Sequence, residues 1–334
     1  MNNNKPTISI VITVRNEINS IKDTMDKLLA LDYPKIEILI YDDVSEDKTS
    51  SVIKKYAHAG IRFVEGARPE SPWLGRNFGV KRLIEQASGE YILLIDSDKP
   101  ISDSGIRHLF DIESDVVTLI EPTSAYKNNL TKLALEPLLP RAESFLKPTV
   151  FFASRDKLSE LFKSTDEGLK TTLNLQLYCQ NEIGYNADVY YDKTRDDTEY
   201  FEFAKNRDFY IRKLYPSLKR SSLITILAIL AYLLVVAIFL IFQFIYVAFT
   251  LLFMFTGPLL IELFLGSPGV LGHHRYSSKY QNLNMDIKEN FMEMLVVLIL
   301  GPFKAVYTMY LMIVSMIKYK KNDVSWRGRK IGLN

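Results

Sequence analysis

The chain of 334 residues contains a single cysteine, Cys179, so it forms no internal disulfide and is compatible with a reducing compartment. Its net charge is only +2 at pH 7, which gives no electrostatic reason to expect a nucleic-acid partner. Residues 1–7 are polar and lack the apolar core of a signal peptide, so we expect the domain that follows to stay in the cytosol. Charge is nearly absent from residues 223–265, where Glu262 is the one formally charged residue.

Short apolar runs rich in isoleucine and valine alternate with amphipathic segments over the first part of the chain. Such runs, without polar alternation, are typical of strands buried on both faces of a parallel sheet. The segments predicted as strands are residues 8–14, 36–41, 61–64, 91–95, 116–120 and 150–153. One predicted helix begins after Asn19 or Ser20, and two more cover residues 49–59 and 75–87. This alternation predicts an α/β fold with an open, mainly parallel sheet and helices on both faces.

Acidic residues stand at the carboxyl ends of two of the predicted strands. Asp42 and Asp43 close one strand, and Asp96 and Asp98 close another. Ligands of open α/β sheets bind in the crevice beyond these strand ends. A pair of carboxylates spaced Asp-x-Asp suits Mg²⁺ or Mn²⁺ bridging a diphosphate, because both cations prefer oxygen ligands. The alternative is that these acids merely cap the turns after the strands.

Four ordered motifs in this region resemble those of family 2 glycosyltransferases, which have the GT-A fold. Residues 8–17 are similar to that family's opening strand and Asn-Glu turn, and residues 41–47 to its Asp-Asp-Gly-Ser-x-Asp loop. Residues 76–79 resemble the Arg-Asn-x-Gly helix, and residues 87–98 the Gly-Glu-Tyr strand that ends in Asp-x-Asp. The resemblance implies an inverting transfer of a sugar from a nucleoside-diphosphate sugar.

The resemblance also assigns roles to individual residues. It places Asp42 or Asp43 against the base, and it gives Asp98 the metal, with Asp96 supporting the metal or the sugar. The residues that it places along the nucleotide sugar are Val14, Asn16, Glu17, Asp42, Asp43, Arg76 and Asp96. Two residues depart from the family pattern: Arg15 stands where Tyr or His is common, and Val44 replaces a loop glycine. The motif Gln-x-x-Arg-Trp is not visible, which argues against a processive synthase of the cellulose or chitin type.

An inverting transferase needs a general base that takes the proton of the acceptor hydroxyl. By the resemblance, this base belongs to an acidic pair that opens a helix some way after Asp-x-Asp, and residues 164–168 are the candidate segment. We prefer Asp166, which places Leu169 and Leu173 at the spacing of a buried helical face, and Glu167 is the second candidate. The alternative is that these acids cap a helix N-terminus.

The second half of the chain has the composition of a membrane anchor. Leu223–Leu265 has 43 residues, enough for two spans of about 20 residues each. Residues 291–317 form a further apolar stretch, interrupted by Gly301-Pro302, that predicts one tilted span or a re-entrant hairpin. The predicted organisation is a glycosyltransferase domain at 1–195, an amphipathic interfacial segment at 196–221, a transmembrane region at 222–317 with spans at 222–265 and 291–317, and a basic cytosolic tail at 318–334.

The tail carries six basic residues and one acid, so the positive-inside tendency predicts that it stays on the cytosolic side. Its residues 324–329 also resemble the Trp-(Lys/Arg)-Gly-Arg ending of membrane-anchored family members. That resemblance brings Arg327 and Arg329 to the diphosphate of the donor. The alternative is a basic anchor on anionic lipid head groups.

These patterns together predict an integral membrane protein that moves a sugar from a nucleoside-diphosphate sugar to a lipid-linked or membrane-embedded acceptor. A catalytically inactive assembly partner is the first alternative, although the intact acids argue against it. An anchored nucleotidyltransferase is the second, and it would require a glycine-rich phosphate loop, whereas residues 11–21 contain no glycine.

Overall fold

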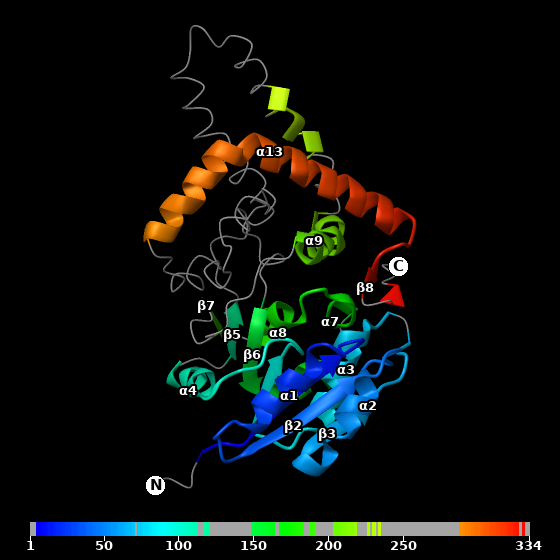
Figure 1. Ribbon diagram of the computed structural model, residues 1–334, viewed down its shortest axis with the longest axis vertical. Helices are drawn as coiled ribbons and strands as arrows, with labels where there is room; N and C mark the ends of the chain where they lie inside the picture. Colours follow the sequence, from blue (N-terminus) through cyan, green and yellow to red (C-terminus); the bar gives the residue numbers. More distant parts are fainter. Residues whose placement is uncertain are drawn as a thin grey trace. The chain divides into compact units, whose positions relative to one another are not determined.

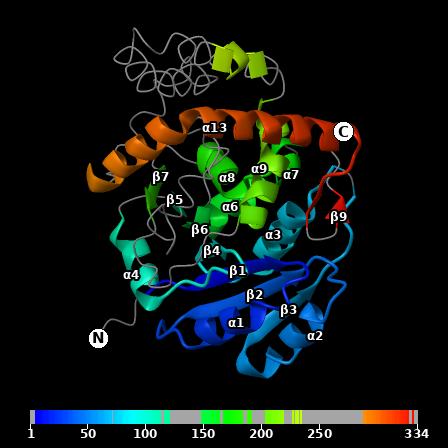
Figure 2. The ribbon, with the colours of Figure 1, turned by 45° about the horizontal axis from the view of Figure 1, so that its top comes forward.

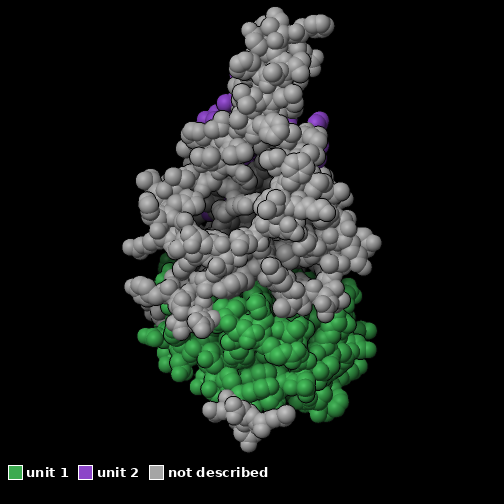
Figure 3. Space-filling view, turned by 90° about the vertical axis from the view of Figure 1, so that its left-hand side faces the viewer, with its two compact units in different colours: residues 1–122, 147–196, 333–334 green, residues 123–146, 197–332 purple. Residues whose placement is uncertain are grey.

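The structure is a computed structural model that describes residues 5–70, 72–112, 116–120, 148–163, 167–183, 187–191, 203–218, 226–227, 229–231, 233–234, 287–326 and 329–330. The chain divides into two compact units, shown in Figure 3. The first unit contains residues 1–122, 147–196 and 333–334, and the second contains residues 123–146 and 197–332. The domain boundaries predicted from the sequence stay predictions.

The first unit is built around one sheet flanked by helices (Figure 1). Its strands are β1 (Ile8–Val14), β2 (Ile36–Asp42), β3 (Ile61–Glu65), β4 (Tyr91–Ile95), β5 (Val116–Ile120), β6 (Pro148–Ser154) and β7 (Ala187–Tyr191). Its helices are α1 (Ile21–Leu29), α2 (Thr49–Lys54), the 3-10 helix η1 (Ala57–Ala59), α3 (Gly75–Gln86), α4 (Asp103–Asp111), α6 (Arg155–Lys163), α7 (Glu167–Thr171) and α8 (Leu175–Ile183).

The sheet has the strand order β3-β2-β1-β4-β6-β5-β7. Neighbours among the first four strands pair in parallel, as do β5 and β7, whereas β6 is antiparallel to both β4 and β5. The predicted α/β fold with a mainly parallel sheet is therefore confirmed. The chain moves outward from β1 to β3 and then returns to place β4 on the other side of β1, so the switch point lies between β1 and β4.

Both faces of the sheet are covered, which explains why apolar side chains occur on both faces of its central strands. Along β1, Ile8, Ile10 and Ile12 pack in the core on one face, while Val11 packs in the core on the other. The first core includes residues of α1, α2 and α4, and the second includes residues of α3, α6, α7 and α8. Each fully buried side chain of this size contributes about 1.5–3 kcal/mol, so neither face tolerates a polar residue at these positions.

Helix α3 lies unusually close to the sheet at Gly79. A Cβ atom at this position would stand 2.5 Å from the ring of Tyr41 on β2 and 2.9 Å from the methyl group of Thr13 on β1. Only glycine permits this approach. It brings the N-terminal turn of α3, with Arg76 and Asn77, against the carboxyl ends of the central strands.

Several predicted bounds change in the structure. The helix predicted at 49–59 is divided into α2 and η1, and the chain leaves η1 through Gly60 with a φ of 98°. The strand predicted at 150–153 extends over Pro148–Ser154. Helices α4, α6 and α8 and strand β7 had no sequence prediction, because segments of five to nine residues contain few repeats of a periodic pattern.

The second unit contains α9 (Phe203–Leu218), the long helix α13 (Ile287–Lys320) and the two-residue strands β8 (Ser325–Trp326) and β9 (Arg329–Lys330). Helix α13 continues through Pro302 and bends along its length (Figures 1 and 2). The chain does not turn back at Gly301-Pro302, so the re-entrant hairpin predicted as one alternative for 291–317 is wrong.

Helix α9 packs against α13 within this unit. The Ser315 hydroxyl donates to the carbonyl of Ile211 at 2.5 Å and accepts the amide of Tyr215 at 3.1 Å. The Tyr319 hydroxyl donates to the carbonyl of Arg212 at 2.6 Å. In the described part of the chain, Leu300–Lys320 is the one helical stretch whose length and composition are sufficient for crossing a membrane. Most of the predicted span at 222–265 lies outside the described residues.

Candidate active site

The predicted site begins with the turn 96–98, which is held against the loop after β1. Ser97, 3% exposed, donates from its hydroxyl to Oε1 of Glu17 at 2.5 Å, and its carbonyl accepts the hydroxyl of Thr24 at 2.6 Å. Both contacts cross the switch point between β1 and β4. The half-buried Asp96 and Asp98 flank this fixed serine, so the two carboxylates have a defined position at the sheet edge.

Glu17 is itself 8% exposed, and its other carboxylate oxygen accepts the hydroxyl of Ser20 at 3.1 Å. Its backbone amide donates to Thr49 at 2.9 Å. Glu17 therefore joins three loops at the carboxyl edge of the sheet. Its predicted place along the nucleotide stays a prediction.

The loop after β2 is built on Asp42, which is 4% exposed. One carboxylate oxygen accepts both the amide and the hydroxyl of Ser45, and the other accepts the hydroxyl of Ser50. The amide of Asp43 donates to the carbonyl of Val14 at 2.8 Å. The predicted residues Val14, Asp42 and Asp43 thus lie together.

A second set of bonds ties this loop to the one after β1. Asn16 has a φ of 52°, and its backbone amide donates to the hydroxyl of Ser45. Its side-chain oxygen accepts the backbone amide of Glu46 at 2.8 Å. Asp47 accepts the amides of Ile18 and Thr49. Partial burial acts to raise the pKa of Asp47, but these hydrogen bonds outweigh it and lower the pKa below its ordinary value. Asp47 therefore remains ionised and holds the loops together at neutral pH.

The contacts of Arg15 explain why this residue departs from the family pattern. Its guanidinium is 3% exposed and donates to the carbonyls of Asp43 and Val44, at 2.7 and 2.5 Å, and to the carboxylate of Glu46 at 2.7 Å. An arginine here supports the backbone of the loop after β2. The sequence marked the position as unusual, but only the structure shows what the guanidinium binds.

Val44 is the second departure, and its backbone has the left-handed conformation with a φ of 55°. This conformation costs a residue with a side chain about 1–2 kcal/mol, and more for a β-branched one, whereas glycine adopts it freely. Val44→Gly is therefore expected to raise the free energy of unfolding by about 1 kcal/mol, measured by urea denaturation.

A matched control for this substitution is Val52→Gly in helix α2, where the backbone is helical. It should lower the free energy of unfolding by at least about 1 kcal/mol, because glycine loses more backbone entropy in a helix and the variant loses the packing of Val52 against the core. A Val44→Gly variant that unfolds as easily as this control would show that the loop is not strained.

Arg76 joins the turn 96–98 to helix α8. Its Nη2 lies 2.5 Å from the carboxylate of Asp96 and 3.4 Å from Oε1 of Gln176. Both ion-pair partners are partly exposed, at 27% and 31% of their side-chain surface, so a ligand can reach them. Asp96 and Arg76 were predicted as donor-binding residues, whereas Gln176 was not, because a neutral amide gives no charge signal in the sequence.

Asn77 brings helix α7 to the same place. Its buried Nδ2 donates to the carbonyls of Leu169 and Thr172, both at 2.9 Å, and the amide of Leu74 donates to the carbonyl of Lys170 at 3.0 Å. Helix α7 starts at Glu167, whose side chain is exposed. The segment that carries the predicted base therefore continues directly into a helix fixed to the N-terminus of α3.

Three of the predicted residues fall outside this geometry. Asp166 and Arg327 lie outside the described residues, and Arg329 lies in β9 of the second unit. Their predicted roles are neither supported nor opposed by the contacts of the first unit.

The carboxylates suit a cation that arrives with a diphosphate. Among the described residues, no three acidic, histidine or cysteine side chains gather to hold a metal ion by themselves. At the turn 96–98 the chain offers two carboxylates, and Asp96 is already paired with Arg76. Mg²⁺ typically takes one or two protein carboxylates and completes its coordination with substrate phosphates and water. Asp96 and Asp98 meet that requirement.

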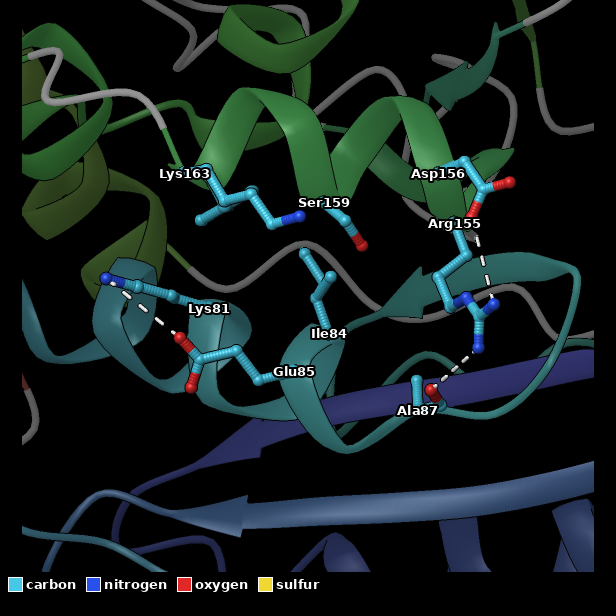
Figure 4. A pocket seen from close by; sticks show the side chains of 9 residues that line it. Lys81, Ile84, Glu85, Ala87, Arg155, Asp156, Ser159 and Lys163 are labelled. Carbon is cyan, nitrogen blue, oxygen red and sulfur yellow. Dashed lines mark hydrogen bonds and ion pairs between the residues drawn. The ribbon is translucent and has the colours of Figure 1, made fainter.

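A groove of about 610 Å³ between α3 and α6 is a separate feature (Figure 4). Its charged groups pair locally: Arg155 donates to the carbonyl of Ala87 and lies 3.7 Å from Asp156, and Lys81 lies 4.0 Å from Glu85. Because β6 runs antiparallel to β4, Arg155 lies beside the start of β4, whereas Asp96 follows its end. The groove therefore opens at the other edge of the sheet.

Comparison with known proteins identifies the domain. The model of the glycosyl transferase family 2 matches residues 9–116, which contain the loops after β1, β2 and β4. This segment is a family 2 glycosyltransferase domain. The GT-A-like architecture predicted from the sequence is confirmed by the strand order together with the similar fold of a solved mannosyltransferase structure.

The family 2 domain is similar to several bacterial proteins. It is 33% identical over 105 residues to a poly-beta-1,6-N-acetyl-D-glucosamine synthase of Staphylococcus epidermidis, covering 31% of this chain and 24% of that protein. A longer match of 228 residues, 26% identical, covers 60% of this chain and 38% of the poly(ribitol-phosphate) beta-N-acetylglucosaminyltransferase TarS of Staphylococcus aureus. The chain thus spans well under half the length of these two relatives.

Among solved structures, the chain is similar to the mannosyltransferase PcManGT from Pyrobaculum calidifontis in complex with GDP-Man and Mn²⁺. The TM-score is 0.50 at 15% identity, and the match covers 95% of this chain and 87% of that one. At this identity the similarity supports the fold alone.

Proposed function

We propose that the protein is an inverting glycosyltransferase that uses a nucleoside-diphosphate sugar as donor. One observation carries the proposal: within a family 2 domain, the partly exposed carboxylate of Asp96 and guanidinium of Arg76 form an ion pair directly after β4, beside the switch point of the sheet. A pair of accessible groups with both charges at this sheet edge suits a ligand that combines a diphosphate with hydroxyl groups.

The proposed roles are those that the resemblance to the family implies. Asp42 or Asp43 contacts the base from the loop after β2, and the backbone from Val14 to Glu17 borders the nucleotide. Arg76 binds phosphate oxygens, and Asp98, with Asp96, holds Mg²⁺ or Mn²⁺ at the diphosphate. The bound cation would neutralise charge on the departing nucleoside diphosphate.

In the reaction, the acceptor hydroxyl oxygen forms a bond to the anomeric carbon while the bond to the diphosphate oxygen breaks. The diphosphate leaves with the bonding electrons, and a carboxylate of this chain takes the hydroxyl proton. Asp166 is our candidate for that base, and Glu167 is the alternative. The segment continues into helix α7, which Asn77 anchors to the N-terminus of α3.

The acceptor is proposed to be lipid-linked or membrane-embedded, because helix α13 presents an apolar face outward. Its exposed side chains between residues 303 and 317 all carry a large apolar surface, and they are Phe303, Val306, Tyr310, Ile313 and Ile317. This set, here called the α13 stripe, recurs every three or four residues over about 21 Å of helix. A helix on a water-exposed surface shows the opposite pattern, with polar residues outward.

Four residues with polar groups in the C-terminal half of the same helix lie on its buried side. Lys304, Thr308, Ser315 and Tyr319 are buried, and Ser315 and Tyr319 bond to α9. The predominantly apolar run Leu223–Leu265, 43 residues long, is too long for a soluble core element. These features support an integral membrane protein with the α13 stripe facing lipid and the catalytic domain in the cytosol. Arg327 and Arg329 of the tail then meet either the donor diphosphate or lipid head groups.

Lipid contact of the α13 stripe predicts a specific accessibility pattern in nanodiscs. A nitroxide on Ile313→Cys, in a Cys179→Ser background, should be relaxed by oxygen more strongly than by a water-soluble nickel chelate. A label on Lys321→Cys, which is exposed just after the helix, should show the reverse. Exclusion of both reagents from the label at 313, with dipolar broadening between labels, would instead indicate a second copy on the stripe.

The proposed activity is tested with the purified full chain in nanodiscs containing Mn²⁺. UDP- and GDP-linked glucose, N-acetylglucosamine and mannose are screened by calorimetry, and release of the nucleoside diphosphate is followed with a membrane lipid extract as acceptor. We expect saturable binding of at least one donor and acceptor-dependent release. Absence of binding for every donor would favour an inactive assembly partner, and incorporation of a nucleotide into product would favour a nucleotidyltransferase.

A further inference from the structure

Gln176 is a buried polar residue at the edge of the candidate site. It lies in the first turn of α8, between Leu175 and Cys179 of the core, and is 2% exposed. Its Oε1 lies 3.4 Å from Nη2 of Arg76. Since a guanidinium only donates hydrogen bonds, the carbonyl oxygen of the amide must face it, and the amide nitrogen must face elsewhere.

That nitrogen has no hydrogen-bond partner in the part of the chain that the structure describes, and it is shielded from water. A buried NH₂ group without an acceptor is unfavourable, and proteins usually pair such groups. Gln176 thus combines one long hydrogen bond with one missing hydrogen bond. Arg76 meanwhile holds Asp96 at 2.5 Å, so the weak contact of Arg76 is the one to the amide.

We propose, on the basis of the proposed function, that Gln176 is a specificity-determining residue whose amide binds a hydroxyl group of the transferred sugar. When phosphate oxygens of the donor attract Arg76, its long bond to Oε1 opens and the amide becomes accessible. The NH₂ group then donates to a sugar hydroxyl oxygen, and Oε1 is free to accept from a hydroxyl. The adjacent Asp96 carboxylate only accepts, so the amide and the carboxylate together match the donor and acceptor pattern of neighbouring hydroxyls.

The test compares the nucleoside diphosphate with the nucleotide sugar in Gln176→Leu, which keeps the approximate volume and removes the amide. Titration calorimetry is performed with UDP or GDP and with the sugar derivative that the wild-type chain binds most tightly. We expect Gln176→Leu to bind the nucleoside diphosphate with an unchanged or slightly lower Kd, because no bond to Arg76 has to open, and the nucleotide sugar about 10-fold more weakly, the effect of about one hydrogen bond. It should unfold at the same or a higher temperature, because the unpaired donor is gone.

Gln86→Leu is the matched control, since it makes the same substitution at the far end of α3. It should change neither Kd. Equal weakening of the nucleoside diphosphate and the nucleotide sugar by Gln176→Leu would overturn the proposal, because the residue would then act on the diphosphate through Arg76. If Gln176→Leu binds the nucleoside diphosphate and the nucleotide sugar as the wild-type chain does, the proposal is also overturned, because Gln176 then has only a packing role. If the wild-type chain binds none of the nucleotide sugars, the proposed function fails, and this inference fails with it.

Discussion

Asp98→Ala is expected to abolish sugar transfer while leaving the fold of the first unit intact. The carboxylate of Asp98 follows the buried strand β4 at the half-exposed turn 96–98, where the proposed cation meets the diphosphate. Loss of a metal ligand that stabilises the leaving group removes several kcal/mol from the transition state, so the rate should fall by at least ~10³-fold. The turn itself is held by Ser97, which the substitution does not touch.

Activity is measured as acceptor-dependent release of the nucleoside diphosphate, and folding is checked by the thermal transition of the variant. Asp156→Ala is the matched control, because its carboxylate is 90% exposed and lies at the groove on the opposite edge of the sheet. It should retain wild-type activity. Full activity of the wild-type chain in excess chelator would contradict the metal role, whatever the effect of Asp98→Ala.

Asp166→Asn is expected to bind the donor normally and to transfer sugar at least ~10²-fold more slowly, the usual contribution of a general base. Asparagine keeps the shape of the side chain but does not take up a proton at neutral pH. It is also as good a helix N-cap as aspartate, so a residue that only caps helix α7 would tolerate the change. The substitution therefore separates the catalytic role from the structural one.

Single-turnover transfer and donor Kd are measured for Asp166→Asn and, in parallel, for Glu167→Gln. The second variant changes the exposed first residue of α7 by the same chemistry. If Glu167→Gln loses transfer and Asp166→Asn does not, the base is the neighbouring residue. If neither variant is impaired, the proton is taken by a group outside this segment.

The strands that carry the site were predictable because their burial is visible in composition. The two faces of a buried parallel sheet are both mainly apolar, and isoleucine and valine therefore occur on both faces of residues 8–14, as the packing of Ile10 and Val11 in opposite cores confirms. The acids after β2 and β4 were found for the same reason, since charge immediately after a buried strand is conspicuous. The bend of α13 without a reversal at Pro302 was not predictable, because a proline interrupts a hydrogen bond without dictating the path of the chain.

The sequence alone determined the family, the order of the central elements and the acids of the candidate site, since these depend on local periodicity and on motifs contiguous in the chain. Only the tertiary structure decided that Arg15 supports the loop after β2, that Asn77 anchors α7 and that Gln176 faces Arg76. The contacts of Asn77 and Gln176 join residues at least 92 positions apart in the sequence. Because such pairings arise from strand order and helix packing, no local pattern in the chain specifies them.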